Sequence, residues 1–194
     1  MAKKICIAVL AAGQSRRFGA SKLLQLHDDR PLLHAALGAA TAAFAGNVYL
    51  VTGHDAAGIA KAASKFRCQQ LVNPKFASGM GSSIAAAAKH CAPVADALII
   101  ALADQPLITA THLATLASTW NGNSKQIVAT EFSGSLGPPV LFGSDYFDWL
   151  AGLQGDQGAR ELLRGNAQAV VAVTFEPASI DIDTPADLGE LDNF

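Results

Sequence analysis

The chain has little of what several common protein classes require. Its 194 residues include three cysteines, Cys6, Cys68 and Cys91, which are scattered and show no metal-ligand spacing. Only 15% of the residues are charged and the net charge is −2, so the basic stripe that nucleic acids need is missing. No apolar run reaches the ~20 residues of a membrane span, and the first apolar stretch is too short for a secretory leader. We therefore expect a cytoplasmic protein with reduced thiols that binds neither nucleic acid nor membrane.

Two familiar phosphate-binding motifs are also absent. A Walker loop has four residues between its glycines, whereas five separate Gly13 from Gly19, and no hydroxyl residue follows Lys22. The three-glycine dinucleotide fingerprint comes nearest at residues 79–84, where its last position is Ile84. These departures argue against a P-loop NTPase and against a nicotinamide oxidoreductase.

What the sequence does contain is an alternation of strand-like and helix-like segments. Apolar runs typical of strands occupy residues 5–10, 48–52, 69–72, 97–102, 126–130, 139–142 and 170–175. Helix-like segments occupy residues 31–44, 56–66, 82–91 and 109–120, with Pro31 expected in the first helical turn and Thr109 as a cap. The alternation predicts one α/β domain over residues 1–194, with a mostly parallel central sheet between two helical layers. In such sheets, ligands bind beyond the carboxyl ends of the strands.

The loop after the first strand has the composition of an anion site. The stretch from Leu10 to Lys22 reads LAAGQSRRFGASK. Its glycines let backbone N–H groups approach an anion, while Arg16, Arg17 and Lys22 supply positive charge. A local basic cluster on a nearly neutral protein suits a small anionic ligand better than a polymer. The loop therefore predicts a nucleoside triphosphate site, although an ordinary turn with solvated arginines is the alternative.

This stretch resembles the signature loop of nucleotidyltransferases similar to molybdenum cofactor cytidylyltransferase, which are related to the molybdenum cofactor guanylyltransferases. The shared pattern is Leu-Ala-Ala-Gly-x-Ser-x-Arg-x-Gly-x-x-Lys, and Phe18 is a mild departure at a position that is often Met. The resemblance implies a single Rossmann-like domain in which Arg17 and Lys22 are catalytic. It also implies that the loop binds the nucleotide through Leu10, Ala11, Ala12, Gly13, Ser15, Arg17 and Lys22.

A second candidate site follows the apolar run at residues 97–102, which continues as Ala-Asp-Gln-Pro. Asp104 thus lies at the carboxyl end of a buried strand. Mg²⁺ prefers carboxylate oxygens and usually takes one or two of them together with substrate phosphates. Asp104 could instead cap the helix that follows. The resemblance extends to Leu-Ala-Asp-Gln-Pro and implies that Asp104 is a catalytic residue and a Mg²⁺ ligand.

Residues 181–188 form a third candidate site. In extended chain, Asp181 and Asp183 face the same side. We expect Thr184 to cap a terminal helix and Asp187 to stabilise its first turn. The family resembled carries Asp-Ile-Asp-Thr-Pro-x-Asp-Leu here, which implies that Asp183 is the second metal ligand and leaves Asp181 as a weaker candidate.

Two middle segments also resemble the family. Asn73-Pro74, followed by Gly79-Met80 and two serines, implies nucleotide contacts from Asn73 and Ser83 and acceptor contacts from Gly79 and Ser82. Both serines could simply cap a helix. The stretch Gly-Asp-Gln-Gly-Ala-Arg ends on Arg160, which is either an acceptor ligand or a solvated helix residue.

The resemblance spans residues 10–188 and implies a reaction. A nucleotidyl group, with CMP from CTP favoured by Ala12 in the loop, is transferred to the phosphate of a molybdopterin-type acceptor, and pyrophosphate is released with the help of Mg²⁺. A molybdoenzyme is a possible recipient of the product. The alternatives are transfer to another phosphorylated acceptor, such as a sugar phosphate, and a non-catalytic chaperone for the molybdenum cofactor. Pro138 stands where related transferases often have histidine, which weakens the choice of acceptor.

Overall fold

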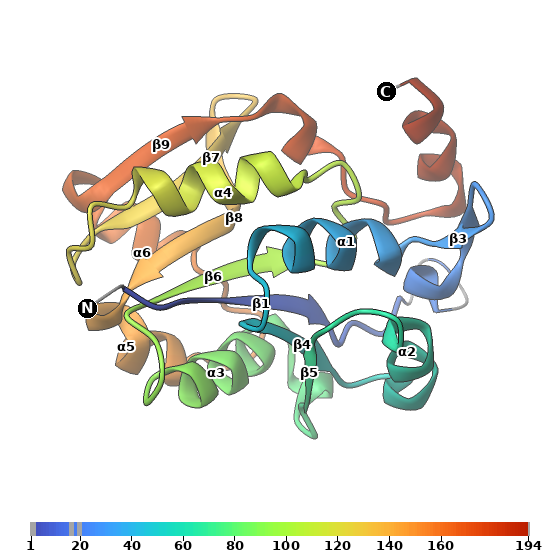
Figure 1. Ribbon diagram of the computed structural model, residues 1–194, viewed down its shortest axis with the longest axis horizontal. Coiled ribbons are helices and arrows are strands. Elements are labelled where there is room, and N and C mark those ends of the chain that lie inside the picture. Colours follow the sequence, from blue (N-terminus) through green and yellow to red (C-terminus); the bar gives the residue numbers. More distant parts are fainter. Residues whose placement is uncertain (1–2, 16–17, 19–20, 194) are drawn as a thin grey trace.

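The computed structural model describes residues 3–15, 18 and 21–193, which are arranged around a seven-stranded sheet (Figure 1). The strand order is β5-β4-β1-β6-β8-β7-β9. The strands are β1 (Ile5–Ala11), β4 (Val48–Thr52), β5 (Gln69–Val72), β6 (Ala97–Leu102), β7 (Ile127–Phe132), β8 (Ser135–Gly143) and β9 (Val170–Thr174). All neighbouring pairs are parallel except those of β8, which runs antiparallel to β6 and β7. The expected mostly parallel sheet is confirmed.

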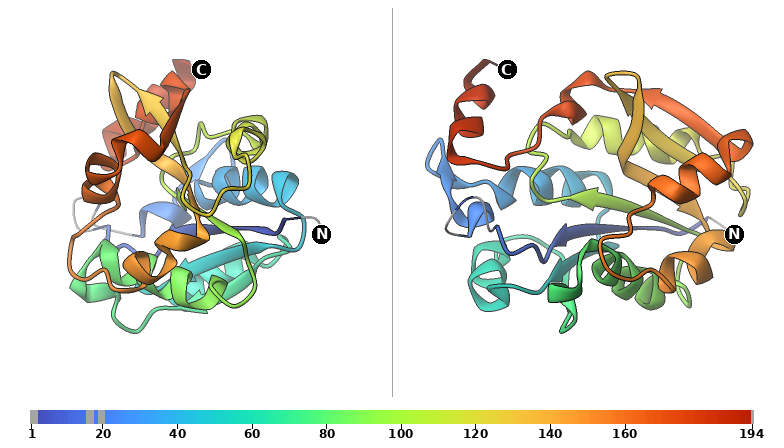
Figure 2. Two further views of the ribbon diagram at one scale, coloured as in Figure 1. Left: turned by 90° about the vertical axis from the view of Figure 1, so that its left-hand side faces the viewer. Right: turned by 180° about the vertical axis from the view of Figure 1, so that it is seen from behind.

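Helices cover both faces of the sheet and complete a three-layer α/β fold. One face carries α1 (Leu33–Ala43), α2 (Ala56–Ala63) and α4 (Ala110–Thr119). The other carries α3 (Met80–Cys91), α5 (Phe147–Ala151) and α6 (Arg160–Gly165), which Figure 2 shows from behind. Side chains alternate along β1, so Ile7 and Val9 enter the first core while Cys6 and Ala8 enter the second. Because both faces are covered, strands such as β1 and β6 are continuously apolar.

Short 3₁₀ segments complete the chain. They are η1 (Lys22–Leu24), η2 (Phe76–Ser78), η3 (Ser144–Tyr146), η4 (Ala167–Ala169), η5 (Glu176–Ser179) and η6 (Pro185–Asn193). The last of these lies beside the hairpin of β2 (Leu26–His27) and β3 (Arg30–Pro31) in Figures 1 and 2. Its Leu191 packs with Leu32 and Ile182 in a small separate core. No helix in the described part of the chain is long and apolar enough to cross a membrane.

The expectation that Pro31 opens a helix is wrong. Pro31 pairs with Leu26 in a two-stranded hairpin of β2 (Leu26–His27) and β3 (Arg30–Pro31), and α1 begins only after it. The hairpin forms because Asp28 and Asp29 both adopt left-handed backbone conformations, with φ of 49° and 58°. This geometry matches the twist of a two-residue hairpin turn, which asparagine and glycine usually provide.

Candidate active site

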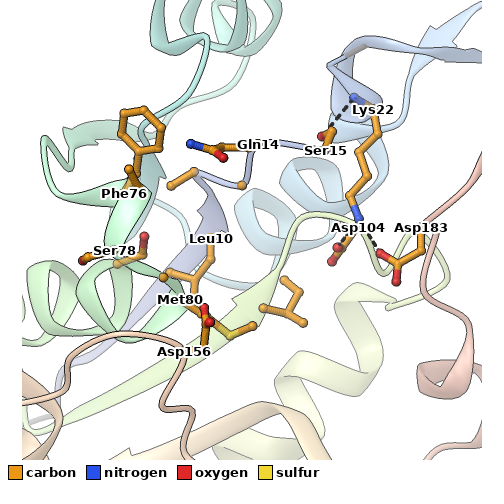
Figure 3. Close-up of a pocket in the computed structure, with 16 residues that line it drawn as sticks. Leu10, Gln14, Ser15, Lys22, Phe76, Ser78, Met80, Asp104, Asp156 and Asp183 are labelled. Atoms are coloured by element: carbon orange, nitrogen blue, oxygen red, sulfur yellow. Dashed lines mark hydrogen bonds and ion pairs between the residues drawn. The ribbon is translucent and has the colours of Figure 1, made fainter. Parts of the chain in front are cut away.

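A cavity of about 470 Å³ opens beyond the carboxyl ends of β1 and β6 (Figure 3). Its volume falls in the range typical of small-molecule sites. Four parts of the chain form the wall: the loop after β1, the turn before α3, the end of β6, and two acidic residues from the last quarter of the chain. The lining residues are Leu10, Ala12, Gly13, Gln14, Ser15, Lys22, Phe76, Ala77, Ser78, Gly79, Met80, Ser83, Leu102, Asp104, Asp156 and Asp183.

Lys22, Asp104 and Asp183 meet at one end of this cavity. The Nζ atom of Lys22 lies 2.7 Å from Oδ2 of Asp104 and 3.0 Å from Oδ1 of Asp183, so one ammonium bridges two carboxylates (Figure 3). The three side chains are 12%, 24% and 48% exposed, respectively. Burial alone would lower the pKa of Lys22, but the charges and hydrogen bonds of the two carboxylates outweigh it and raise that pKa above its usual value. Lys22 is therefore held in its cationic form.

The local fold aims Lys22 at the two carboxylates. The neighbouring Leu23 is buried in the main core, which anchors η1. The backbone N–H of Lys22 donates to Oγ of Ser15 at 3.3 Å, and the Ser15 carbonyl accepts from Phe18 N–H at 2.9 Å. Ser15 itself has a left-handed backbone, with φ of 49°. Ser15 is thus hydrogen-bonded to both Phe18 and Lys22.

The C-terminal segment is attached directly to the end of β6. The N–H of Ile182 donates to the Asp104 carbonyl at 3.0 Å, and Ile182 is fully buried. Nearby, the buried Gln105 side chain donates from Nε2 to the Ala178 carbonyl at 2.9 Å. These bonds place the residue after Ile182, which is Asp183, opposite Lys22.

Asp187 caps this segment, as predicted, although the segment is a 3₁₀ helix rather than the expected α-helix. Its carboxylate accepts from the N–H of Asp183 at 2.8 Å, the N–H of Thr184 at 2.7 Å and the hydroxyl of Thr184 at 2.8 Å. These hydrogen bonds, that of Thr184 N–H foremost, lower the pKa of Asp187. Asp181 is exposed and does not line the cavity, yet partial desolvation and the charge of Asp104 raise its pKa to about 6.

The wall of the cavity opposite Lys22 is formed by the turn before α3 and by Asp156 (Figure 3). This opposite wall rests on a buried asparagine. Asn73 is 3% exposed, and its amide donates to Oγ of Ser82 at 2.9 Å and Oγ of Ser83 at 3.0 Å. Ser82 in turn donates towards the carbonyls of Lys75 and Gly79. The N-cap of α3 is Gly79, and no side chain caps that helix end, so the alternative in which either serine caps α3 is wrong.

Gly79 and Gly155 bring a distant loop to this wall. Gly79 has φ of 114°, and a Cβ there would lie 2.3 Å from the backbone C and O of Gly155 and 2.5 Å from Oδ1 of Asp156. The N–H of Gly81 donates to the Gly155 carbonyl at 2.9 Å. The close backbone contact carries the Asp156 carboxylate into the cavity (Figure 3). Arg160, at the first residue of α6, is exposed and is not among the lining residues.

The structure thus gathers most of the predicted site residues. Those that line the cavity are Leu10, Ala12, Gly13, Ser15, Lys22, Gly79, Ser83, Asp104 and Asp183. Those that do not are Ala11, which is buried in the core, Asn73, Ser82 and Arg160. The predicted catalytic residue Arg17 lies outside the described residues, as do Arg16 and Gly19. Asp156 is in the Gly-Asp-Gln-Gly-Ala-Arg motif, from which the sequence analysis took only Arg160 as a candidate ligand. The lining residues that the sequence analysis missed are Gln14, Phe76, Ala77, Ser78, Met80, Leu102 and Asp156.

The donor set suits a hard divalent cation. Lys22 Nζ acts as a stand-in, because it shows that one cation can contact Asp104 and Asp183 at once. Mg²⁺ takes one or two carboxylates and completes its shell with water and phosphate oxygens. Among the described residues, no group of three or more His, Cys, Asp or Glu gathers that could hold a metal alone. The site therefore fits a metal that is shared with a phosphate ligand.

The family model of the MobA-like NTP transferase domain matches residues 7–171 of the chain. The purine catabolism protein PucB of Bacillus subtilis strain 168 is 29% identical over 187 residues, which cover 91% of this chain and 90% of PucB. Rv0371c of Mycobacterium tuberculosis H37Rv is 28% identical, with a TM-score of 0.84 over 100% of both chains. Its complex with manganese has a TM-score of 0.77 at 25% identity, over 97% of both chains.

A fourth likeness shows the fold alone. Mth528, a nucleotidyl transferase from Methanothermobacter thermautotroptrophicus, is 19% identical with a TM-score of 0.85, over 99% of this chain and 97% of that one. The family match covers most of the chain and includes the loop after β1 and Asp104. It confirms the resemblance seen in the signature loop. The chain therefore belongs to the family of MobA-like NTP transferase domains, which are nucleotidyltransferases.

Proposed function

We propose that the protein transfers a nucleotidyl group, CMP from CTP in preference, to the phosphate of a molybdopterin-type acceptor and releases pyrophosphate. The observation that carries this proposal is the meeting of Lys22, Asp104 and Asp183 at the end of one cavity. A cation and two carboxylates at the mouth of a glycine-containing loop are the groups that a metal-bound polyphosphate requires. The family supplies the reaction class.

The chain's own residues provide binding and charge. Ala12, Gly13 and Lys22 line the same cavity, so the backbone N–H groups near Ala12 and Gly13 would bind the triphosphate and Lys22 would supply a cation beside it. Fixed donors and charges of this kind stabilise the charge that develops on departing pyrophosphate. Arg17, which the signature loop adds, is assigned to the same task.

The reaction needs positioning more than covalent chemistry from the protein. An oxygen of the acceptor phosphate forms a bond to the α-phosphorus, and the bond from that phosphorus to the bridging oxygen of pyrophosphate breaks. Mg²⁺ held by Asp104 and Asp183 would neutralise phosphate charge and make the α-phosphorus more electrophilic. Because the acceptor phosphate is already ionised, no general base is required.

The opposite wall is assigned to the acceptor. Gly79 lies there together with Asp156, whose carboxylate accepts hydrogen bonds and so favours an acceptor rich in N–H or O–H groups. A pterin presents several such groups. Ser83, which lines the same cavity, is assigned to the nucleotide. The preference for CTP rests on Ala12 in the loop and on the resemblance to cytidylyltransferases. Arg160, which does not line the cavity, is retained as a candidate ligand of the acceptor phosphate.

A pyrophosphate-release assay tests the proposal. CTP, GTP, ATP and UTP are supplied in turn with Mg²⁺, with and without molybdopterin, and with sugar phosphates as competing acceptors. We expect release that depends on both CTP and molybdopterin and that stops with EDTA. Release with a sugar phosphate alone would reassign the acceptor, and tight molybdopterin binding without any release would identify a chaperone instead.

A further inference from the structure

The strongest unexplained feature of the site is that its two proposed metal ligands already hold a cation. Oδ2 of Asp104 and Oδ1 of Asp183 both contact the same Nζ of Lys22, at 2.7 Å and 3.0 Å. Charge-assisted bonds of this length are among the strong hydrogen bonds of proteins. A metal that binds the same two oxygens has to displace the ammonium first.

We infer that Lys22 is an internal counter-ion of the metal site, which keeps the free protein from taking up a divalent cation until a nucleoside triphosphate draws the lysine away. This inference rests on the proposed function, since it takes Asp104 and Asp183 as metal ligands. It goes beyond that function because it assigns Lys22 a role before any nucleotide is bound. The role is to set the order in which ligands enter.

Burial and charge explain why the counter-ion is needed. The Lys22 side chain is only 12% exposed and Asp104 is 24% exposed, so solvent screens this pair less than it would a surface pair. Without Lys22, the carboxylates of Asp104 and Asp183, whose oxygens now lie 2.7 Å and 3.0 Å from the same Nζ, would face each other. Like charges at such distances disfavour one another strongly. A cation is therefore always required, and in the free protein the lysine provides it.

A triphosphate supplies the alternative partner for the lysine. The ammonium is a compact charge with three rotatable donors on a flexible stem. Ala12, Gly13 and Ser15 line the same cavity as Lys22, so a polyphosphate bound to that loop comes within the space the side chain can reach. When Lys22 turns to phosphate oxygens, Asp104 and Asp183 are released for the metal. By linkage, the nucleotide then raises the metal affinity by the same factor by which the metal raises the nucleotide affinity.

Mn²⁺ binding, followed by electron paramagnetic resonance without any turnover, tests the inference. The variants are Lys22→Met and Lys22→Gln, which remove the charge, and Lys22→Arg, which keeps it. Lys89→Met, on the exposed end of α3, is the matched control for net charge. Without nucleotide, we expect Lys22→Met and Lys22→Gln to bind Mn²⁺ at least about tenfold more tightly than the wild type, which corresponds to ~1.4 kcal/mol. Lys22→Arg and Lys89→Met should stay within a few-fold of the wild type.

The possible outcomes distinguish a failure of the counter-ion role from a failure of the proposed function on which it rests. If the wild type binds Mn²⁺ with CTP, and Asp104→Asn abolishes that binding, the metal site stands. If Lys22→Met and Lys22→Gln, shown to be folded by circular dichroism, then bind Mn²⁺ as weakly as the wild type without nucleotide, the counter-ion role is overturned. If Mn²⁺ binding with CTP is instead indifferent to Asp104→Asn and Asp183→Asn, the metal assignment itself fails, and the counter-ion role fails with it.

Discussion

The backbone N–H of Ile182 donates to the carbonyl of Asp104 at 3.0 Å, although the two residues lie in distant parts of the sequence. This one bond joins the end of β6 to the C-terminal segment. Ile182 is fully buried beside Leu32 and Leu191, so the segment is held by packing as well. Two carboxylates from distant parts of the sequence thereby face one lysine.

Loss of either carboxylate should nearly abolish turnover. We expect Asp104→Asn and Asp183→Asn each to reduce the rate of pyrophosphate release by about a hundred- to a thousandfold, as removal of one electrostatic contact to reacting phosphate typically does. The substitutions keep side-chain volume, so thermal melts should show an intact fold. Asp148→Asn, at an exposed position of α5, is the control and should keep wild-type turnover. Normal turnover in Asp104→Asn would remove Asp104 from the mechanism.

Asp187 should act through Asp183 rather than on the substrate. Removal of its carboxylate in Asp187→Ala frees the N–H groups of Asp183 and Thr184 that it now accepts from. We expect turnover to fall by about 10- to 100-fold, which is the usual effect of losing a group that orients a metal ligand. Mn²⁺ affinity in the presence of CTP should weaken in parallel. Unchanged Mn²⁺ affinity together with lost turnover would contradict a positioning role.

The same variant should change the acid sensitivity of the fold. The folded-state pKa of Asp187 is lowered, first by the hydrogen bond from Thr184 N–H. A carboxyl of this kind stabilises the fold above its unfolded pKa of about 3.9, and this stability is lost as the pH falls through the lower folded value. Melting curves between pH 2.5 and roughly 6 should therefore show a shallower acid decline in Asp187→Ala than in the wild type. Parallel curves would show that Asp187 makes no such contribution.

The sequence predicted those parts of the site that lie in continuous motifs. The loop after β1, Asp104 and Asp183 each follow a recognisable pattern, and the strands at 48–52, 69–72 and 97–102 have the expected bounds. The antiparallel course of β8 was not predictable, because an apolar run such as residues 139–142 reads the same in either direction. It follows from the tight turn at Ser133 and Gly134, which joins β7 directly to β8.

Asp156 could not have been placed from sequence for a different reason. Its motif predicts a turn before a helix, but the reach of its side chain depends on how closely that turn approaches α3. That distance is set by Gly79 and Gly155, which contact each other backbone to backbone from opposite halves of the chain. The hairpin at Pro31, where a helix was expected, was also not predictable from sequence. Its turn, Asp28-Asp29, lacks the glycine that such two-residue turns usually contain.

Gly79→Ala should therefore disrupt the opposite wall of the cavity, which is assigned to the acceptor. A methyl group would lie 2.3 Å from the Gly155 backbone, and φ of 114° is itself strained for alanine. We expect the free energy of unfolding to fall by about 1–3 kcal/mol, and hence the melting temperature to fall by roughly 2–12 °C. The KM for the acceptor should rise more than the KM for the nucleotide, because the displaced loop carries Asp156. Gly165→Ala, where a Cβ meets nothing within 4 Å, should melt like the wild type.

Equal increases in both KM values, or none, would contradict the assignment of this wall to the acceptor. Asp156→Asn provides the sharper comparison, since it keeps the volume and the loop. It converts an acceptor-only group into one that also donates. We expect the acceptor KM to rise about tenfold, close to the value of one lost charge-assisted hydrogen bond, with the CTP KM unchanged.

His112 should account for a decline in stability at mildly acidic pH. Its side chain is 4% exposed and lies flat on Phe175, with ring centroids 4.2 Å apart. The Thr130 hydroxyl donates to the Pro139 carbonyl at 2.7 Å, so the Oγ of Thr130 must accept from His112 Nε2–H, which lies 2.9 Å away. Burial lowers the pKa of His112 to about 4, so the folded protein keeps the ring neutral.

The sign of the pH effect follows from the two states of His112. The unfolded chain binds a proton near pH 6.5 and the folded chain only near pH 4, so the stabilisation is complete above 6.5 and is lost as the pH falls towards 4. The full loss is on the order of 3 kcal/mol. Asp181, with its pKa raised to about 6, acts in the opposite sense, because the folded state binds its proton more readily. The change of the wild-type unfolding free energy with pH is therefore the sum of both contributions, and only a comparison with a variant isolates that of His112.

His112→Gln keeps a donor towards Thr130 and does not titrate. Urea unfolding at pH 4.5 and 7.5 should therefore show a smaller difference in unfolding free energy between the two pH values in the variant than in the wild type. If both proteins lose the same free energy of unfolding between these pH values, the neutral buried ring is not the cause.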